Sequence, residues 1–419
     1  MPYDATQTFS EKEAPRRVVV TGAGIVTSLG VGWEANAAGF QEGRSALRKI
    51  TLFDTAQQRT QQGGEVPMPA NIDPRNLTSR QKKRLDRASK LLLLAGYEAW
   101  DQSGWGDAER ALEPPLVIGT SAGGMSLGEA YYQQAHTEPT RRQGQASRVA
   151  LYQPQNQLLN LCQALDVAGP ITIVSNACAS GADAVGQAYR LIRQGRAQCV
   201  ITGGYDALCQ LVFAGFDSLQ ALSPTLPRPF DANRDGLALG EGAAVLMLED
   251  EERAQARGAT ILGEIVGYGA ATDVHHLTQP HPDGVAAVAS MDAACHEASI
   301  APCEIDYLNA HGTGTPLNDL AEGAAIQRWA GTDVTKIKVS STKGAIGHLL
   351  GGAGAVETVI ALMTLQEQWI PPSLNVRTPD PVCTFDLVLE PRQVPVNHVL
   401  TNSFGFGGSN ASLILRRAP

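Results

Sequence analysis

The chain contains eight short runs of β-branched and aliphatic residues, each followed by a glycine-containing turn. In order, they are "RRVVVTGAG" (16–24), "PLVIGTSAGG" (115–124), "ITIVSNACASG" (171–181), "CVITGGYDA" (199–207), "ILGEIVGYGAATD" (261–273), "IDYLNAHGTGTP" (305–316), "KIKVSSTKGAIG" (336–347) and "HVLTNSFGFGGSNASLIL" (398–415). The last four repeat the pattern of the first four, and the third run of each series leads into a helix of small residues. We infer an internal duplication.

This alternation of strands and helical patterns predicts an α/β fold of parallel strands with crossover helices. Two related halves would pack around a pseudo-two-fold axis and turn the carboxyl ends of their strands toward one cleft, where such sheets bind ligands. We place the halves at residues 16–260 and 261–416, after a flexible tail at residues 1–15. The charged segment "EDEERAQARGATILGE" reads as a helix that joins them directly, without a linker.

Charge and hydropathy exclude several functions. The formal charge of −9 argues against bulk attraction to nucleic acid or to an anionic membrane. The sequence contains no run of about 18 apolar residues, so no transmembrane helix is predicted. The 7 cysteines are an odd number without CxxC spacing, which indicates free thiols and a cytoplasmic location.

Cys178 stands where the strand-like "ITIV" gives way to the helical pattern "CASGADAVGQAYRLIRQG". A cysteine in the first turn of a helix would lie near unpaired N–H groups and the positive end of the dipole, which lowers a thiol pKa. The same position also suits a buried and inert cysteine. Position alone leaves both interpretations open.

Two histidines favour the nucleophile. His311 follows a strand in "NAHGTGTP", and His348 lies between glycines in "KGAIGHLLGGAGAVE". These loops belong to the half opposite Cys178, so the duplicated fold would bring a Cys-His-His set together.

Five ordered motifs resemble those of elongating β-ketoacyl-acyl-carrier-protein synthases, the synthase II and type II polyketide ketosynthase group of the thiolase superfamily. They are "NACASGADAVGQA", "RPFDANRDGLALGEGAAVLMLE", "NAHGTGTPLNDLAE", "STKGAIGHLLGGAGAVE" and "TNSFGFGGSNASL". The resemblance runs over nearly all of residues 16–416. It implies a thiolase-like fold with duplicated βαβ halves in five layers, α-β-α-β-α.

The resemblance also implies an activity, the decarboxylative condensation of an acyl chain on Cys178 with malonyl-acyl-carrier protein. The N–H groups of Cys178 and Phe406 would form the oxyanion hole, and Phe406 would gate the acyl pocket. His311 and His348 would bind the malonyl thioester and stabilise its enolate.

Further roles follow from the same resemblance. Lys343 would support the electrostatics of the site, and Glu357 would hold Lys343 in place. Thr313 and Thr315 would bind the phosphopantetheine arm, and Phe404 would contact substrate. Ala122 would line the acyl pocket where related enzymes carry a bulkier isoleucine. Tyr152 would reach a partner's pocket across a dimer interface.

The resemblance finally predicts the partners. The basic run "SRQKKRLDRASK" offers Lys82, Lys83 and Arg84 for docking an acidic acyl carrier protein. A homodimer is expected, with a heterodimer of a related ketosynthase-like subunit as the other possibility. No metal and no organic cofactor are expected beyond the carrier's phosphopantetheine, because "DVHHLTQPHPDG" matches no common zinc pattern.

Other members of the superfamily and other enzyme classes use a different or smaller set of residues. A degradative thiolase, an initiating synthase and a chain-length factor lack this Cys-His-His set. A Cys-His hydrolase of acyl thioesters would need only Cys178 and one histidine. A non-catalytic subunit of a ketosynthase heterodimer would not acylate Cys178.

Overall fold

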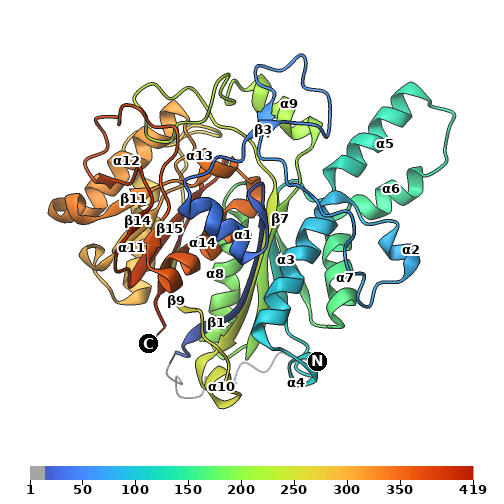
Figure 1. The fold of residues 1–419 in the computed structure, drawn as a ribbon, viewed down its shortest axis with the longest axis horizontal. Coiled ribbons are helices and arrows are strands. Elements are labelled where there is room, and N and C mark those ends of the chain that lie inside the picture. The colour runs from blue at the N-terminus through green and yellow to red at the C-terminus, as the bar shows by residue number, and fades with distance from the viewer. Residues whose placement is uncertain (1–14, 419) are drawn as a thin grey trace, which may run out of the picture.

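The structure is a computed structural model, and the residues that it describes are 15–418. The predicted tail, residues 1–15, lies outside the described residues except for Pro15. Among the described residues, no helix combines the length and the hydropathy that a membrane span requires. Figure 1 shows a central body of sheet and helices, from which one helical hairpin projects.

Each half of the chain contributes five principal strands to one continuous sheet. The first five are β1 (Val18–Thr27), β5 (Leu116–Gly119), β6 (Ile171–Val174), β7 (Cys199–Asp206) and β8 (Gly242–Asp250). The second five are β9 (Gly263–Thr272), β10 (Tyr307–Asn309), β11 (Lys338–Ser340), β15 (His398–Phe404) and β16 (Ser409–Arg416). Short strands complete the set: β2 (Gly30–Val31), β3 (Arg48–Lys49), β4 (Gln62–Gly63), β12 (Trp369–Ile370), β13 (Asp386–Leu387) and β14 (Arg392–Gln393).

The strand order confirms the duplication. The first half runs β6-β5-β7-β8-β1 and the second half runs β11-β10-β15-β16-β9. Both are therefore third-second-fourth-fifth-first in chain order, with parallel pairing at the same two junctions and antiparallel pairing at the other two. The halves join where β1 pairs with β9.

Helices cover both faces of the sheet. The first half contains α1 (Trp33–Gln41), α2 (Ser79–Lys82), α3 (Arg87–Ser103), α4 (Asp107–Arg110), α5 (Met125–Thr137), α6 (Gln145–Tyr152), α7 (Pro154–Leu165), α8 (Ser180–Arg193), α9 (Gln210–Ser218) and α10 (Glu251–Ala256). The second contains α11 (Val285–Ala298), α12 (Pro316–Ala330), α13 (Lys343–Ile346) and α14 (Ala353–Glu367), with 3-10 turns at Pro302–Glu304, Gly331–Lys336 and Leu350–Gly352. Only α10 forms in the charged segment between the halves.

The five layers follow from which helix packs on which strand. Helix α3 covers β1 and β8, α11 covers β9 and β16, and α8 and α14 pack together between the two half-sheets (Figure 1). The α8–α14 contact is close because its residues are small: a Cβ added at Gly181 would stand 2.8 Å from the backbone nitrogen of Ala355. This arrangement is the predicted thiolase-like fold, and it brings the carboxyl ends of both sets of strands to one region.

Candidate active site

Cys178 lies in a tight turn between β6 and α8. Ala177, the preceding residue, has φ of 48°, a left-handed conformation that costs free energy in a non-glycine residue. The hydroxyls of Ser121 and Ser180 hold this turn, since both donate to the carbonyl oxygen of Ala177, at 2.8 and 2.6 Å. Helix α8 begins at Ser180, so the prediction that Cys178 lies in its first turn was wrong by two residues.

The predicted lowering of the Cys178 pKa was also wrong. Burial raises the pKa of this thiol to about 12, while the charge of Lys343 and the backbone N–H of Phe406 oppose the rise. The thiol is only 7 % exposed, and loss of solvation of the thiolate outweighs the favourable groups around it. Cys178 therefore rests as a neutral thiol, and its proton must leave as the sulfur attacks.

His311 and His348 lie beside each other across from Cys178. Their ring centroids are 5.3 Å apart and the rings are nearly perpendicular. Burial first, and then the charge of Lys343, holds the pKa of both histidines well below its usual range, so both rings are neutral. Nδ1 of His348 accepts the N–H of Leu350 at 3.2 Å, which places the ring proton on Nε2, where it can be donated to a ligand.

A buried carboxylate holds the His311 segment. Glu322, on α12, accepts the backbone N–H groups of His311 and Gly312, both at 2.8 Å. Burial raises the pKa of Glu322 to about 7 against these hydrogen bonds. Among the described residues, Nδ1 of His311 has no hydrogen-bond partner.

Lys343 and Glu357 form a buried ion pair below the histidines. Lys343 begins α13 and Glu357 lies on α14, with side chains 2 % and 3 % exposed. Isolated buried charges are costly, so each of the two requires the other. The charge of Lys343 acts on Cys178 and on both histidines, which is the placement that its predicted electrostatic role requires.

The loop between β15 and β16 closes over Cys178. A Cβ added at Gly405 would stand 3.1 Å from the backbone nitrogen of Cys178, so the glycine allows the two segments to meet. The next residue is Phe406, whose ring stacks on Phe216 of α9 with centroids 5.8 Å apart. Gly408 has φ of 85°, and no larger side chain fits there because its Cβ would meet the carbonyl oxygen of Asp273.

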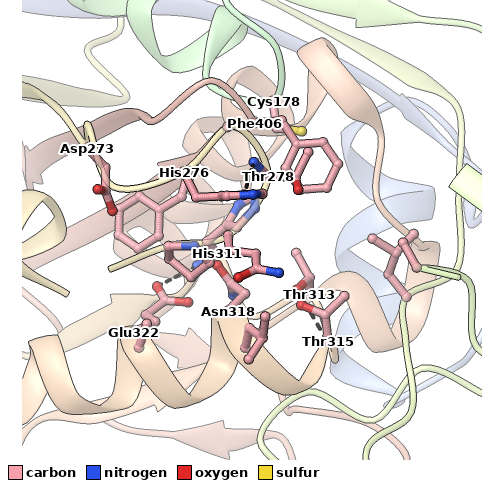
Figure 2. Close-up of a pocket in the computed structure, with 18 of the residues that line it drawn as sticks. Cys178, Asp273, His276, Thr278, His311, Thr313, Thr315, Asn318, Glu322 and Phe406 are labelled. Carbon is pink, nitrogen blue, oxygen red and sulfur yellow. Dashed lines mark hydrogen bonds between the residues drawn. The ribbon is translucent and has the colours of Figure 1, made fainter. Parts of the chain in front are cut away.

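These side chains line one cavity of about 420 Å³ (Figure 2). Of the residues predicted from sequence, the cavity is lined by Cys178, His311, His348, Thr313, Thr315, Phe404 and Phe406. The hydroxyl oxygens of Thr313 and Thr315 are 2.9 Å apart. The buried guanidinium of Arg234 fixes the threonine loop, because it donates to the carbonyl oxygens of Thr315 at 3.2 Å and Pro316 at 2.7 Å.

Ala122, predicted to line the acyl pocket, does not line this cavity. It is buried in an apolar cluster with Phe213, Leu237 and Leu350, among others. The carboxylate of Asp206, at the end of β7, accepts the backbone N–H groups of Ser121, Ala122, Gly123 and Gly351, together with the hydroxyl of Thr120. Asp206 thus ties the Ala122 turn to the segment that follows His348.

Other predicted residues lie away from the cavity. Tyr152 ends α6, and its ring lies against Gly128 in the projecting α5–α6 hairpin. Lys82, Lys83 and Arg84 are exposed at α2 and its C-terminal end. Of the three loop histidines, only His276 lines the cavity, whereas the rings of His275 and His281 contact each other, with centroids 5.0 Å apart.

The sequence prediction missed Asp206, Arg234 and Phe216. A signal existed for the first two. Asp206 ends one of the recognised strand runs, and Arg234 lies in the middle motif "RPFDANRDGLALGEGAAVLMLE". Phe216 carried no signal because its partner, Phe406, is 190 positions away along the chain.

A buried thiol and two neutral histidines, supplied by opposite halves of a duplicated sheet, define an acyl-transferring condensing enzyme with a thiolase-like fold. The chain matches the beta-ketoacyl synthase N-terminal domain over residues 15–254 and the C-terminal domain over residues 262–377. It belongs to the beta-ketoacyl synthase family.

Known proteins resemble it over almost their full length. A 3-oxoacyl-[acyl-carrier-protein] synthase 2 of Synechocystis is 37 % identical, over 96 % of this chain and 98 % of the relative. The structure titled the ishigamide ketosynthase/chain length factor superposes with a TM-score of 0.89 at 33 % identity, covering 97 % of this chain and 100 % of that one. A type II polyketide ketosynthase solved with its acyl carrier protein and a bound hexaketide superposes with a TM-score of 0.87 at 27 % identity. The match covers 97 % of this chain and 100 % of that one.

Proposed function

We propose that this chain condenses an acyl group carried on Cys178 with malonyl-acyl-carrier protein, releasing carbon dioxide and a 3-oxoacyl-carrier protein. The observation that carries the proposal is the single cavity in which Cys178 faces His311 and His348. A hydrolase needs only one histidine, which acts as a base. A second neutral histidine adds a hydrogen-bond donor that can stabilise the oxygen of an enolate.

The first step loads the acyl chain. The sulfur of Cys178 attacks the acyl thioester carbonyl, and the backbone N–H groups of Cys178 and Phe406 stabilise the oxyanion. The bond from the carbonyl carbon to the carrier's sulfur then breaks. Because the Cys178 pKa is raised, its proton moves during the attack and ends on the departing carrier thiol.

The second step forms the carbon–carbon bond. Nε2–H of His348 and the ring of His311 hold the malonyl thioester oxygen while the carboxylate leaves as carbon dioxide. The resulting enolate carbon attacks the acyl carbonyl on Cys178, and the bond between that carbonyl and the sulfur breaks. Cys178 leaves as a thiolate and takes a proton from water, because its own proton left with the first carrier thiol and the malonyl carboxylate brings none. Burial first, and then the charge of Lys343, keeps both histidines neutral, so that they donate hydrogen bonds without being charged.

The partners follow from the same proposal. An acyl carrier protein delivers both substrates, and its phosphopantetheine arm enters between Thr313, Thr315 and Phe404. The chain acts as a homodimer or with a related ketosynthase-like subunit, in fatty acid or type II polyketide elongation. The scheme uses no metal and no other organic cofactor. All 7 cysteines fall within the described residues and are free thiols, which supports a location in the reducing cytoplasm.

Mass spectrometry of the intact protein tests the proposal. Incubation with an acyl-carrier protein should add the acyl mass at Cys178, and subsequent malonyl-carrier protein should remove it, with equal amounts of carbon dioxide and 3-oxo product. Release of free acid without carbon dioxide would instead identify a thioester hydrolase. A protein that never acylates, alone or with a related subunit, would be a non-catalytic partner.

A further inference from the structure

Asn176, two residues before the nucleophile, makes contacts that the catalytic scheme does not use. Its side-chain amide carries two hydrogens and donates to two groups, the carboxylate of Asp183 at 2.6 Å and the hydroxyl of Ser409 at 2.5 Å. Asp183 lies in the first turn of α8, and Ser409 begins β16, directly after the loop that carries Phe406. One amide therefore joins three segments that surround Cys178.

The two groups that accept from this amide are also fixed to each other. Asp183 is buried, and its second carboxylate oxygen accepts the hydroxyl of Tyr268 at 2.7 Å. Tyr268 lies on β9, which pairs with β16 from Ser409 onward. Gly186 leaves room for this contact, because a Cβ there would stand 2.3 Å from the Tyr268 ring. A closed ring of contacts results, which we call the Asn176 network: Asn176, Asp183, Tyr268 and Ser409.

The turn of Cys178 and the loop of Phe406 have to keep a fixed spacing. The proposed oxyanion hole takes one N–H group from each, and the N–H of Phe406 bonds to the thiol of Cys178 in the structure. Misplacing a reacting group by about 1 Å can cost about 10²-fold in rate. Among the described residues, the Asn176 amide makes the only side-chain hydrogen bond between residues 175–179 and 404–409.

Two ordinary roles do not account for Asn176. An asparagine that caps a helix accepts a backbone N–H through its side-chain oxygen, but α8 has no side-chain cap and the Asn176 amide is a donor. A substrate ligand would line the cavity, and Asn176 does not. Backbone hydrogen bonds tie the loop of Phe406 to Asp273 and Leu277 instead, so they do not set its distance from the cysteine.

We propose that Asn176 is a positioning residue for acyl transfer, because its two hydrogen bonds set the spacing of the N–H groups of Cys178 and Phe406. The inference rests on the proposed function and goes further, since it separates acyl transfer from malonyl decarboxylation. Decarboxylation uses the two histidines, and no hydrogen bond among the described residues joins them to the Asn176 network.

Loading and decarboxylation are measured separately in each variant. Asn176→Leu keeps a similar volume without a hydrogen to donate, so acyl loading at saturating acyl-carrier protein should slow about ten- to hundred-fold. KM for the carrier and decarboxylation of malonyl-carrier protein should stay nearly constant. Ser409→Ala removes the other end of the bridge and should show the same selectivity with a smaller loss. Asn160→Leu is the matched control, because this buried amide on α7 donates to Ser89 and does not line the cavity.

An exchange of the two polar groups tests the bridge itself. Asn176→Asp places two carboxylates against each other and should load acyl groups at least as slowly as Asn176→Leu. The double variant Asn176→Asp, Asp183→Asn restores a donor opposite an acceptor, so it should load faster than Asn176→Asp alone. The absence of any gain would contradict the bridge.

Three further results would overturn the proposal. The first is an equal loss of loading and decarboxylation, which would reduce Asn176 to a residue that stabilises the fold. The second is unchanged loading in both Asn176→Leu and Ser409→Ala. The third is a change of oligomeric state in these variants by sedimentation, which would make Asn176 a contact between copies. If the unaltered protein neither loads an acyl group nor releases carbon dioxide, the proposed function itself fails.

Discussion

The two halves of the sheet use their corresponding strand ends differently. In the second half, the ends of β10, β11 and β15 lead to His311, Lys343 with His348, and Phe406. In the first half, only the end of β6 supplies a reactive group, Cys178, while the ends of β5 and β7 are joined through Asp206. Duplication therefore gives matching positions, and the residues that occupy them separate nucleophile from enolate chemistry.

The most severe test removes the reactive group of the first half. In Cys178→Ala, acyl loading and condensation should fall by more than about 10⁴-fold, because no other cysteine among the described residues lines the cavity. Decarboxylation of malonyl-carrier protein should continue, since the histidines of the second half remain. The ratio of carbon dioxide to 3-oxo product measures this, and loss of both activities would show that the halves do not act separately.

The converse test removes one of the two histidines that the second half supplies. His311→Ala should reduce condensation by about 10²- to 10³-fold, the usual effect of losing one donor to a developing oxyanion. Acyl loading of Cys178, followed by intact mass, should stay within a few-fold of the unaltered protein. His296→Ala, an exposed histidine on α11, is the matched control. Equal loss of loading and condensation would contradict the assignment of acyl loading to the first half and enolate chemistry to the second.

Burial and the charge of Lys343 together lower the pKa values of the two histidines in the second half. Lowered histidine pKa values keep both rings neutral as the pH falls below about 6.5, so condensation should persist there. Lys343→Met removes one cause of the lowering, and the acid limb of the pH profile should move to higher pH.

Because Lys343→Met also strands Glu357, it should cost about 3–5 kcal/mol of unfolding free energy in urea. The double variant Lys343→Met, Glu357→Met should recover most of this loss, and it is the protein in which to measure the pH profile. An unmoved acid limb in the double variant would show that Lys343 does not set the protonation of the histidines.

A smaller effect is expected in the first half at Asp206. Asp206→Asn replaces an acceptor by a group that presents N–H to the backbone N–H donors around it, which costs about 1–3 kcal/mol. Acyl loading should slow by about ten-fold as the Ala122 turn shifts, and malonyl decarboxylation should change less. A greater effect on decarboxylation would place Asp206 with the histidines instead.

The smallest effect is expected at Arg234. Arg234→Lys keeps the charge but loses the planar fork that binds the carbonyl oxygens of Thr315 and Pro316. KM for malonyl-carrier protein should rise about five-fold with kcat nearly constant, and Arg234→Met should raise it further. A fall in kcat without a change in KM would contradict a role in holding the threonine loop.

Sequence reasoning identified the parts of the site that belong to local patterns. The duplication, the strand runs and the glycine loops were readable because hydrophobic runs and turn residues leave local signals. Cys178 and His348 each follow the third strand of their half, β6 and β11.

Reasoning failed where long-range packing decides the outcome. The dipole argument for Cys178 ignored burial, which the neighbouring strands and the Gly405 loop impose from distant parts of the chain. The stack of Phe216 on Phe406 and the hydrogen bonds that Asp206 accepts from five residues likewise join segments that no local pattern connects.

The position of β16 has a consequence for synthesis. Although β15 and β16 are synthesised after every other strand of this sheet, β16 lies in the interior of the sheet, between β15 and β9. The nascent chain therefore holds Cys178 and both histidines before the loop that covers the cysteine exists. Until residues 398–416 are in place, the edge of β9 and the thiol stay uncovered, so this interval exposes the newborn protein to oxidation and misassembly.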